Sequence, residues 1–152
     1  NGSDPVAREA MSQAQYIAGM GFSNVGLGIV HSMAHPLGAH YDTPHGVANA
    51  LLLPYVMEYN AESPAAPKYI QIAKAMGVNT DGMTEAEGVQ AAIEAVKQLS
   101  LSIGIPQKLN EIGVRKEDLH TLAIDAFNDV CTGGNPRPTS IEDIEALYNK
   151  AY

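Results

Sequence analysis

The chain has 152 residues, of which 45% are hydrophobic, and its single cysteine, Cys131, excludes an intrachain disulfide and is typical of a reducing, cytoplasmic environment. Its formal net charge of −8 argues against nucleic acid as a partner, because a phosphate backbone would repel it. No apolar run approaches the roughly 20 residues of a membrane-spanning helix, and the start, NGSDPVARE, lacks the basic and apolar regions of a signal peptide, so we expect neither.

The first residues of the chain predict a helix. Asp4 followed by Pro5 predicts an N-cap and a first helical residue. Alanines then recur at three- or four-residue steps, which predicts a smooth face for close helix packing. Several glycines weaken the end of this helix, so we expect a bend or loop near residues 22–24. A second helix over residues 27–35 should stop or kink at Pro36, since proline cannot donate the next helical hydrogen bond.

A third helix is expected to begin at Pro44, where Asp42 and Thr43 have the side chains of capping residues. After a linker, a short helix over residues 68–76 should end at Gly77, since glycine commonly follows the last turn of a helix.

Two capping boxes are predicted in the second half of the chain, Thr84 with Glu87 and Thr139 with Glu142. Each precedes apolar residues at helical period, and a further apolar stripe spans residues 119–130. Two-residue alternation never persists beyond a few positions. The expected fold class is therefore all-α, with seven to eight helices in one domain over residues 1–152.

Four of the five histidines lie in the stretch HSMAHPLGAHYDTPHG. Imidazole is both a common transition-metal ligand and a proton carrier near neutral pH. His31 and His35 are four residues apart and share a helix face, which permits two ligands to one ion or a ligand beside a proton carrier. A turn after Pro36 could return His45 to the same point. Asp42 is either an oxygen ligand there or, as favoured above, a cap.

The competing interpretation is that these are ordinary surface or core histidines that lie close in sequence by chance. It is retained for His40, which has no partner at suitable spacing, and for His120, at the edge of an apolar stripe. Even three histidines do not complete a structural tetrahedral site. Besides a metal-dependent enzyme, a helical metal-binding or assembly module completed by a partner chain stays open. So does a metallo-hydrolase, although it lacks the glutamate of an H-E-x-x-H motif.

Two long segments carry a family resemblance. AGMGFSNVGLGIVHSMAHPLGAHYDTPHGVANALLLPYVMEYN and GVRKEDLHTLAIDAFNDVCTGGNPRPTSIEDIEALY resemble the iron-containing (group III) alcohol dehydrogenases, and together they cover nearly the whole chain. The resemblance implies the all-helical C-terminal domain of a dehydroquinate synthase-like fold, normally preceded by a dinucleotide-binding domain. It implies a homodimeric, NAD(P)-dependent enzyme acting on a small alcohol or diol and its aldehyde. The glycines here do not form the G-x-G-x-x-G fingerprint, so the nucleotide-binding half is expected to be absent and the chain alone inactive.

The resemblance also assigns residue roles. The family binds one divalent iron through four protein ligands, and two of these correspond to His31 and His45, with Zn²⁺ as the alternative metal. The other two, an aspartate and a histidine, precede the matched segment, which accounts for the incomplete ligand set. His35 corresponds to a non-ligand histidine near the nicotinamide and substrate, and is a candidate proton relay. Phe22 and Cys131 match pocket-lining positions. Without the resemblance, the alternative that Phe22 is a core residue and Cys131 a small buried one is equally open.

Overall fold

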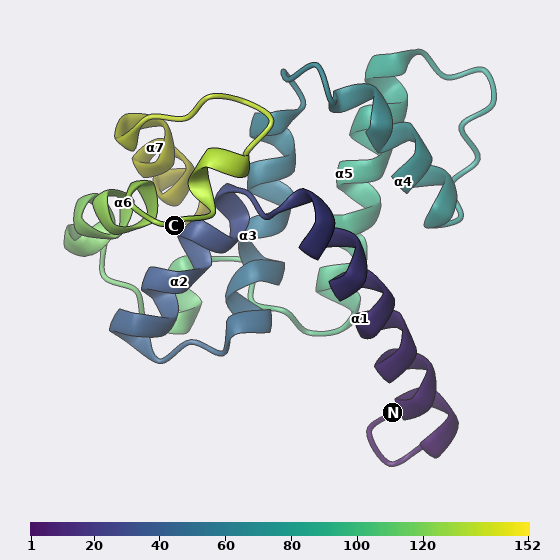
Figure 1. Cartoon of the computed structure of the whole chain (residues 1–152), viewed down its shortest axis with the longest axis horizontal. Helices are drawn as coiled ribbons and strands as arrows, with labels where there is room; N and C mark the ends of the chain where they lie inside the picture. The colour runs from purple at the N-terminus through teal and green to yellow at the C-terminus, as the bar shows by residue number, and fades with distance from the viewer.

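Seven α-helices, four short 3₁₀ helices and no strand make up the computed structural model, which describes residues 1–152 (Figure 1). The all-α class is confirmed. The α-helices are α1 (Pro5–Val25), α2 (Ile29–Tyr41), α3 (His45–Asn60), α4 (Tyr69–Ala75), α5 (Glu85–Ser102), α6 (Leu119–Phe127) and α7 (Ile141–Ala151). The 3₁₀ helices are Ala66–Lys68, Leu109–Ile112, Lys116–Asp118 and Thr132–Gly134. None of the helices combines the length and apolar character that crossing a membrane demands.

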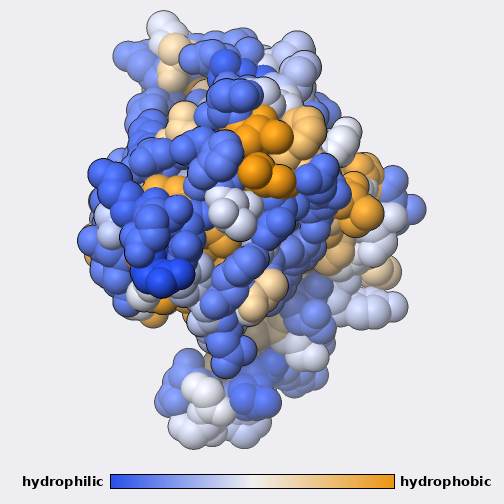
Figure 2. Space-filling model, turned by 90° about the vertical axis from the view of Figure 1, so that its left-hand side faces the viewer, coloured by the Kyte–Doolittle hydropathy of each residue, from blue (hydrophilic) through white to orange (hydrophobic).

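The main core lies where α2 packs between α3 and α6, and where α7 covers α6. Met33, Leu37, Leu52, Leu122 and Tyr148 are all fully buried there. A second, smaller core joins α3, α4 and α5. Burial of apolar side chains at helical spacing is the main stabilising contribution in both. The face in Figure 2 is mostly hydrophilic, with small hydrophobic patches between charged and polar side chains.

Helix α1 has no tertiary packing of this kind. It has 21 residues and none is buried, and it extends away from the other helices towards the N-terminus (Figure 1). Its large apolar side chains are between 45% and 81% exposed, namely Val6, Met11, Tyr16, Ile17, Met20, Phe22 and Val25. The alanine face predicted for close packing therefore has no partner within these 152 residues.

The beginning of α1 follows the prediction, whereas its end does not. The Asp4 side chain accepts from the backbone N–H groups of Val6 and Ala7, as expected of an N-cap. The bend expected near residues 22–24 is wrong, because the helix continues to Val25. It ends at Gly26, whose φ of 81° lies in the left-handed region that glycine adopts without steric cost.

The helix that carries His31 and His35 does not stop at Pro36. Proline lies inside α2, which runs on to Tyr41. A proline within a helix leaves the carbonyl four residues earlier, here that of Ser32, without its usual donor. The adjacent Met33 carbonyl accepts from the buried Tyr148 hydroxyl at 2.6 Å, which ties this turn of α2 to α7. The chain reverses later than expected, at Asp42, which has a left-handed backbone with φ of 53°.

The expected cap of the third helix is also wrong. Asp42 ends α2 instead of capping α3, and Pro44 itself occupies the N-cap position without a side-chain hydrogen bond. The Thr43 hydroxyl is buried and has no hydrogen-bond partner. The left-handed turn at Asp42 leaves Thr43 inside the junction, where its hydroxyl does not reach the first N–H groups of α3.

Of the two predicted capping boxes, the first is confirmed, since Thr84 and Glu87 bond to each other's backbone N–H. The second is displaced by one residue. Ser140 and Asp143 form it, not Thr139 and Glu142. The predicted apolar stripe over residues 119–130 is buried only as far as Ala126, because α6 ends one residue later. Val130, beyond the helix, is 95% exposed.

Candidate metal centre

Three histidines meet where the first half of α2 faces the beginning of α3. His31 lies in the first turn of α2, His35 follows one turn later, and His45 is the first residue of α3. The ring centres of His31 and His45 are 5.4 Å apart, as are those of His35 and His45, and those of His31 and His35 are 6.2 Å apart. The return of the chain thus brings the three imidazoles into one cluster.

The chemistry of this donor set fits a divalent metal ion. Burial, followed by the neighbouring His45 and His35, lowers the pKa of His31, and a neutral imidazole is the form that coordinates a metal. Two imidazoles bound at about 2.0–2.1 Å to one tetrahedral ion have ring centres roughly 5 Å apart. The His31–His45 separation is close to that value, although two ligands alone leave the coordination shell incomplete.

Asn49 contacts both the backbone carbonyl and the ring of His45. Its side-chain Nδ2 donates to the His45 carbonyl at 2.9 Å and lies 3.1 Å from His45 Nε2. Since the first contact requires an N–H group, the same nitrogen donates to Nε2, which must be the unprotonated nitrogen of the ring. The single lone pair of Nε2 accepts this hydrogen bond, so a metal ion bound at Nε2 would have to replace the contact with Asn49.

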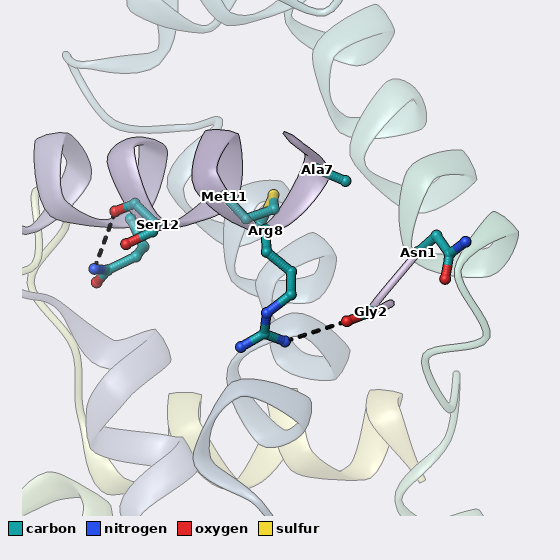
Figure 3. Close-up of a pocket in the computed structure, with 7 residues that line it drawn as sticks. Asn1, Gly2, Ala7, Arg8, Met11 and Ser12 are labelled. Carbon is teal, nitrogen blue, oxygen red and sulfur yellow. Dashed lines mark hydrogen bonds between the residues drawn. The ribbon is translucent and has the colours of Figure 1, made fainter. Parts of the chain in front are cut away.

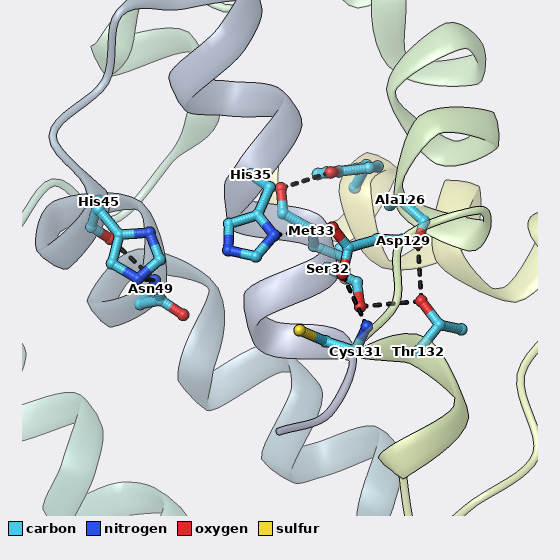
Figure 4. Close-up of polar contacts among 10 residues, drawn as sticks. Ser32, Met33, His35, His45, Asn49, Ala126, Asp129, Cys131 and Thr132 are labelled. Carbon is cyan, nitrogen blue, oxygen red and sulfur yellow. Dashed lines mark hydrogen bonds and ion pairs between the residues drawn. The ribbon is translucent and has the colours of Figure 1, made fainter. Parts of the chain in front are cut away.

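On the other side of the cluster, His35 contacts a residue that sequence reasoning missed. His35 Nδ1 lies 2.8 Å from Asp129 Oδ2, and Asp129 Oδ1 accepts from the backbone N–H of Cys131 at 2.8 Å (Figure 4). Burial alone would raise the pKa of the Asp129 carboxyl, but these hydrogen bonds outweigh it and hold the pKa below its ordinary value. The carboxylate is therefore ionised.

Cys131 lies beside this pair. Possible ligand atoms of His35, Asp129 and Cys131 are all within 4.8 Å of one another, so they form a second group that could hold a cation. Burial, and then contact with Asp129, raise the pKa of the Cys131 thiol. A neutral thiol suits the predicted pocket-lining position better than it suits a nucleophile.

Phe22 is near the cluster but not in the core. Its ring centre is 6.4 Å from that of His31, and the residue is 45% exposed at the end of α1. His40 and His120 lie outside the cluster, as expected. Each is exposed and paired with a carboxylate at 2.8 Å, Asp125 and Glu145 respectively.

A cavity of about 800 Å³ opens beside His31, between the start of α2, one side of α3 and the loop at residues 134–136. This loop lies hard against the chain that leads into α2, because a Cβ on Gly134 would be 2.0 Å from the Leu27 carbonyl oxygen. The side-chain amides of Asn60 and Asn135 bond to each other at 2.9 and 3.0 Å and hold the loop to the end of α3.

Another hollow, of about 460 Å³, lies between the first half of α1 and the first residues of the chain (Figure 3). The only charged side chain in its lining is Arg8, which donates to the Gly2 carbonyl at 3.5 Å. It has no histidine, cysteine or carboxylate, and so no counterpart of the cluster around His31.

Residues 1–152 match the model of the "Fe-containing alcohol dehydrogenase family, C-terminal". The chain is 58% identical over 149 residues to lactaldehyde reductase of Escherichia coli strain K12, which is 98% of this chain and 39% of that protein. It is 44% identical over 151 residues to 1,3-propanediol dehydrogenase of Citrobacter freundii, which is 99% of this chain and 39% of that protein.

Solved structures agree with these relatives. A crystal structure of 1,3-propanediol oxidoreductase superposes with a TM-score of 0.95 at 44% identity, over 99% of this chain and 39% of that one. An alcohol dehydrogenase from Oenococcus oeni gives a TM-score of 0.95 at 43% identity, over all of this chain and 39% of that one. The 152 residues thus span about two fifths of the length of the proteins they match.

Proposed function

Because the chain belongs to the Fe-containing alcohol dehydrogenase family, we propose that it is the helical, metal-binding part of an enzyme that interconverts a small alcohol or diol and its aldehyde with NAD(H). The lactaldehyde reductase type is favoured, since 58% of aligned residues are shared with such an enzyme. The observation that carries the proposal is the convergence of three imidazole rings at the junction of α2 and α3.

His31 and His45 are the proposed metal ligands. Their 5.4 Å ring separation and the lowered pKa of His31 support a shared divalent ion, Fe²⁺ in the first place and Zn²⁺ as the alternative. The remaining ligands would come from a preceding part of the polypeptide. When bound, the metal supplies Lewis-acid polarisation of the substrate oxygen, and the nicotinamide exchanges a hydride with the substrate carbon.

The other residues around the cluster have proposed roles that follow from their positions. His35 is the proton relay between the substrate oxygen and solvent, because its ring borders the same space as His45 and its side chain is 40% exposed. Phe22 supplies an apolar wall next to His31, and Cys131 lines the pocket as a neutral thiol.

We further propose that this domain follows an N-terminal dinucleotide-binding domain in a cytoplasmic homodimer. The uncovered apolar side chains of α1 support a covering surface elsewhere in the polypeptide, since a 21-residue helix with no buried residue has little tertiary stabilisation. The relatives' greater length also supports it, because they extend well beyond the matched 39%.

A helical metal-binding module without its own catalysis is the second candidate. The group formed by His35, Asp129 and Cys131 favours it, since three ligand atoms within 4.8 Å of each other could hold a zinc ion that a partner completes.

One experiment separates the two candidates. The coding sequence upstream of this chain is expressed together with it, and aldehyde-dependent NADH oxidation is assayed with added ferrous iron. The dehydrogenase proposal expects turnover that depends on iron and is retained in a His40→Ala control, because His40 lies outside the cluster. Absence of turnover, combined with tight zinc binding by residues 1–152 alone, would favour the module.

A further inference from the structure

Asp129 is the carboxylate that contacts the histidine cluster. It follows the last residues of α6, and its side chain is 18% exposed. Its two oxygens have different partners, since Oδ2 faces His35 Nδ1 and Oδ1 accepts the backbone N–H of Cys131, each at 2.8 Å. The side chain therefore connects the loop after α6 to α2.

The loop that carries Asp129 is anchored to α2 independently of His35. The Thr132 hydroxyl donates to the Ala126 carbonyl at 2.7 Å, and its oxygen lies 2.8 Å from the hydroxyl of Ser32, which is fully buried on α2 (Figure 4). The Asp129 carboxylate is thus held in place by its surroundings, and it can in turn hold the His35 ring.

The partners of Asp129 determine where the proton of His35 resides. An ionised carboxylate only accepts hydrogen bonds, so His35 Nδ1 must be the donor in the 2.8 Å contact. In a neutral imidazole the other nitrogen, Nε2, then carries no proton and has a free lone pair. Figure 4 shows this second nitrogen on the side of the ring that faces His45.

We propose that Asp129 is a positioning residue, which fixes His35 in the Nδ1–H tautomer and aims Nε2 at the space beside His45 as a proton acceptor. The proton-accepting step rests on the function proposed above. In that step the proton of the substrate hydroxyl bonds to Nε2 and its O–H bond breaks. The resulting imidazolium keeps its Nδ1–H bond to the negative Asp129, which stabilises it.

Asp129→Asn is a sharp test because the loop dictates how the amide must lie. The Cys131 N–H requires an oxygen, so the amide oxygen replaces Oδ1 and the NH₂ group faces His35. That NH₂ group donates, so Nδ1 has to become the acceptor. The tautomer then reverses, and Nε2 acquires a proton that prevents it from accepting another.

The first measurement needs no turnover. Long-range ¹H–¹⁵N correlation spectra of the histidine rings are recorded on the metal-free complete polypeptide. The expected result is a protonated Nδ1 and an unprotonated Nε2 for His35, reversed in Asp129→Asn. Asp125→Asn is the matched control, since Asp125 contacts His40 at the same 2.8 Å and is not a hydrogen-bond partner of His35. It should leave the His35 spectrum unchanged.

The second measurement is kinetic. Asp129→Asn should lower kcat by roughly 10²-fold or more, within the range that general acid–base catalysis contributes, with KM and iron content near the wild-type values. Asp129→Glu, which retains a carboxylate, should recover part of kcat. In a His35→Ala background the Asn substitution should cause no further loss, because it acts through a ring that is no longer present.

Three results would overturn the positioning role: an unchanged His35 tautomer in Asp129→Asn, an unchanged kcat, or an additional loss in the His35→Ala background. Should Asp129→Asn unfold the loop, the Cys131 amide resonance would shift, and the Asp129→Glu comparison then decides. If the wild-type enzyme turns over no alcohol, the proposed function fails, but the tautomer spectra still decide whether Asp129 positions His35.

Discussion

Of all the glycines in the chain, Gly134 is the one where an added Cβ would come closest to another part of the backbone. A Cβ there would be 2.0 Å from the Leu27 carbonyl oxygen, which belongs to the backbone and cannot swing aside. Leu27 and Gly28 lead directly into the turn of α2 that carries His31. The glycine therefore allows the loop after α6 to support the position of a proposed metal ligand.

We expect Gly134→Ala to destabilise the protein by about 1–3 kcal/mol, as overpacking does elsewhere. Gly133→Ala is the control, since a Cβ at Gly133 meets nothing within 4 Å. Thermal unfolding of both variants checks the expectation. Equal melting temperatures for the two variants would contradict it, because the loop would then accommodate the added methyl group without loss of stability.

Sequence spacing was informative for some site residues and silent for others. His31 and His35 could be placed on one face because helical period fixes positions within a helix, and a turn before His45 was indicated by the prolines and glycines. Asp129 could not be found this way. It is 94 residues from His35 along the chain, and their contact depends on how α6 packs against α2.

At the scale of elements, the helices were predictable and several of their ends were not. Apolar period identified α5, α6 and α7, because burial of one face is what stabilises them. The ends of the helices depend on individual hydrogen bonds, which the apolar period does not report. Helix α2 continues past Pro36, and Tyr148, which lies 115 residues away, donates to the Met33 carbonyl in the turn before it. No local pattern reports that contact.

The capping box of α7 gives a pH-dependent expectation. Hydrogen bonds from Ser140, the backbone N–H first, lower the pKa of Asp143. A carboxyl whose pKa is lower in the folded state stabilises the fold above its unfolded pKa of about 3.9, and this stabilisation is lost as the pH falls through the folded value. The ionised Asp143 therefore stabilises α7 at neutral pH, and this contribution is lost in acid.

We expect Asp143→Ala to lower the free energy of unfolding near neutral pH by about 1 kcal/mol, the usual cost of a lost cap. The difference from wild type should shrink in acid, once Asp143 is protonated in both states. Urea unfolding at the two pH values measures this. Glu142→Ala is the control, because Glu142 makes no contact in the box; an equal loss in that variant would contradict the assignment.

At the scale of the whole molecule, the 152 residues form two helical cores and one long helix, α1, that neither core covers. They correspond to 39% of the length of the relatives. The proposed metal site is incomplete in the same way, because His31 and His45 would supply two ligands where a metal site with an open position normally has three or more from the protein. Both observations support a larger polypeptide as the unit of function.

The central claim is that His31 and His45, and not His35, hold a divalent iron in that larger polypeptide. Iron per chain, measured on the purified complete protein, tests it most directly. Removal of a ligand should cost at least the roughly 10–100-fold in affinity that loss of an outer-shell partner costs. His31→Ala and His45→Ala should therefore be depleted of iron, whereas His35→Ala and the His40→Ala control should retain it. Iron retained after loss of His31 or His45, or lost with His35, would contradict the account.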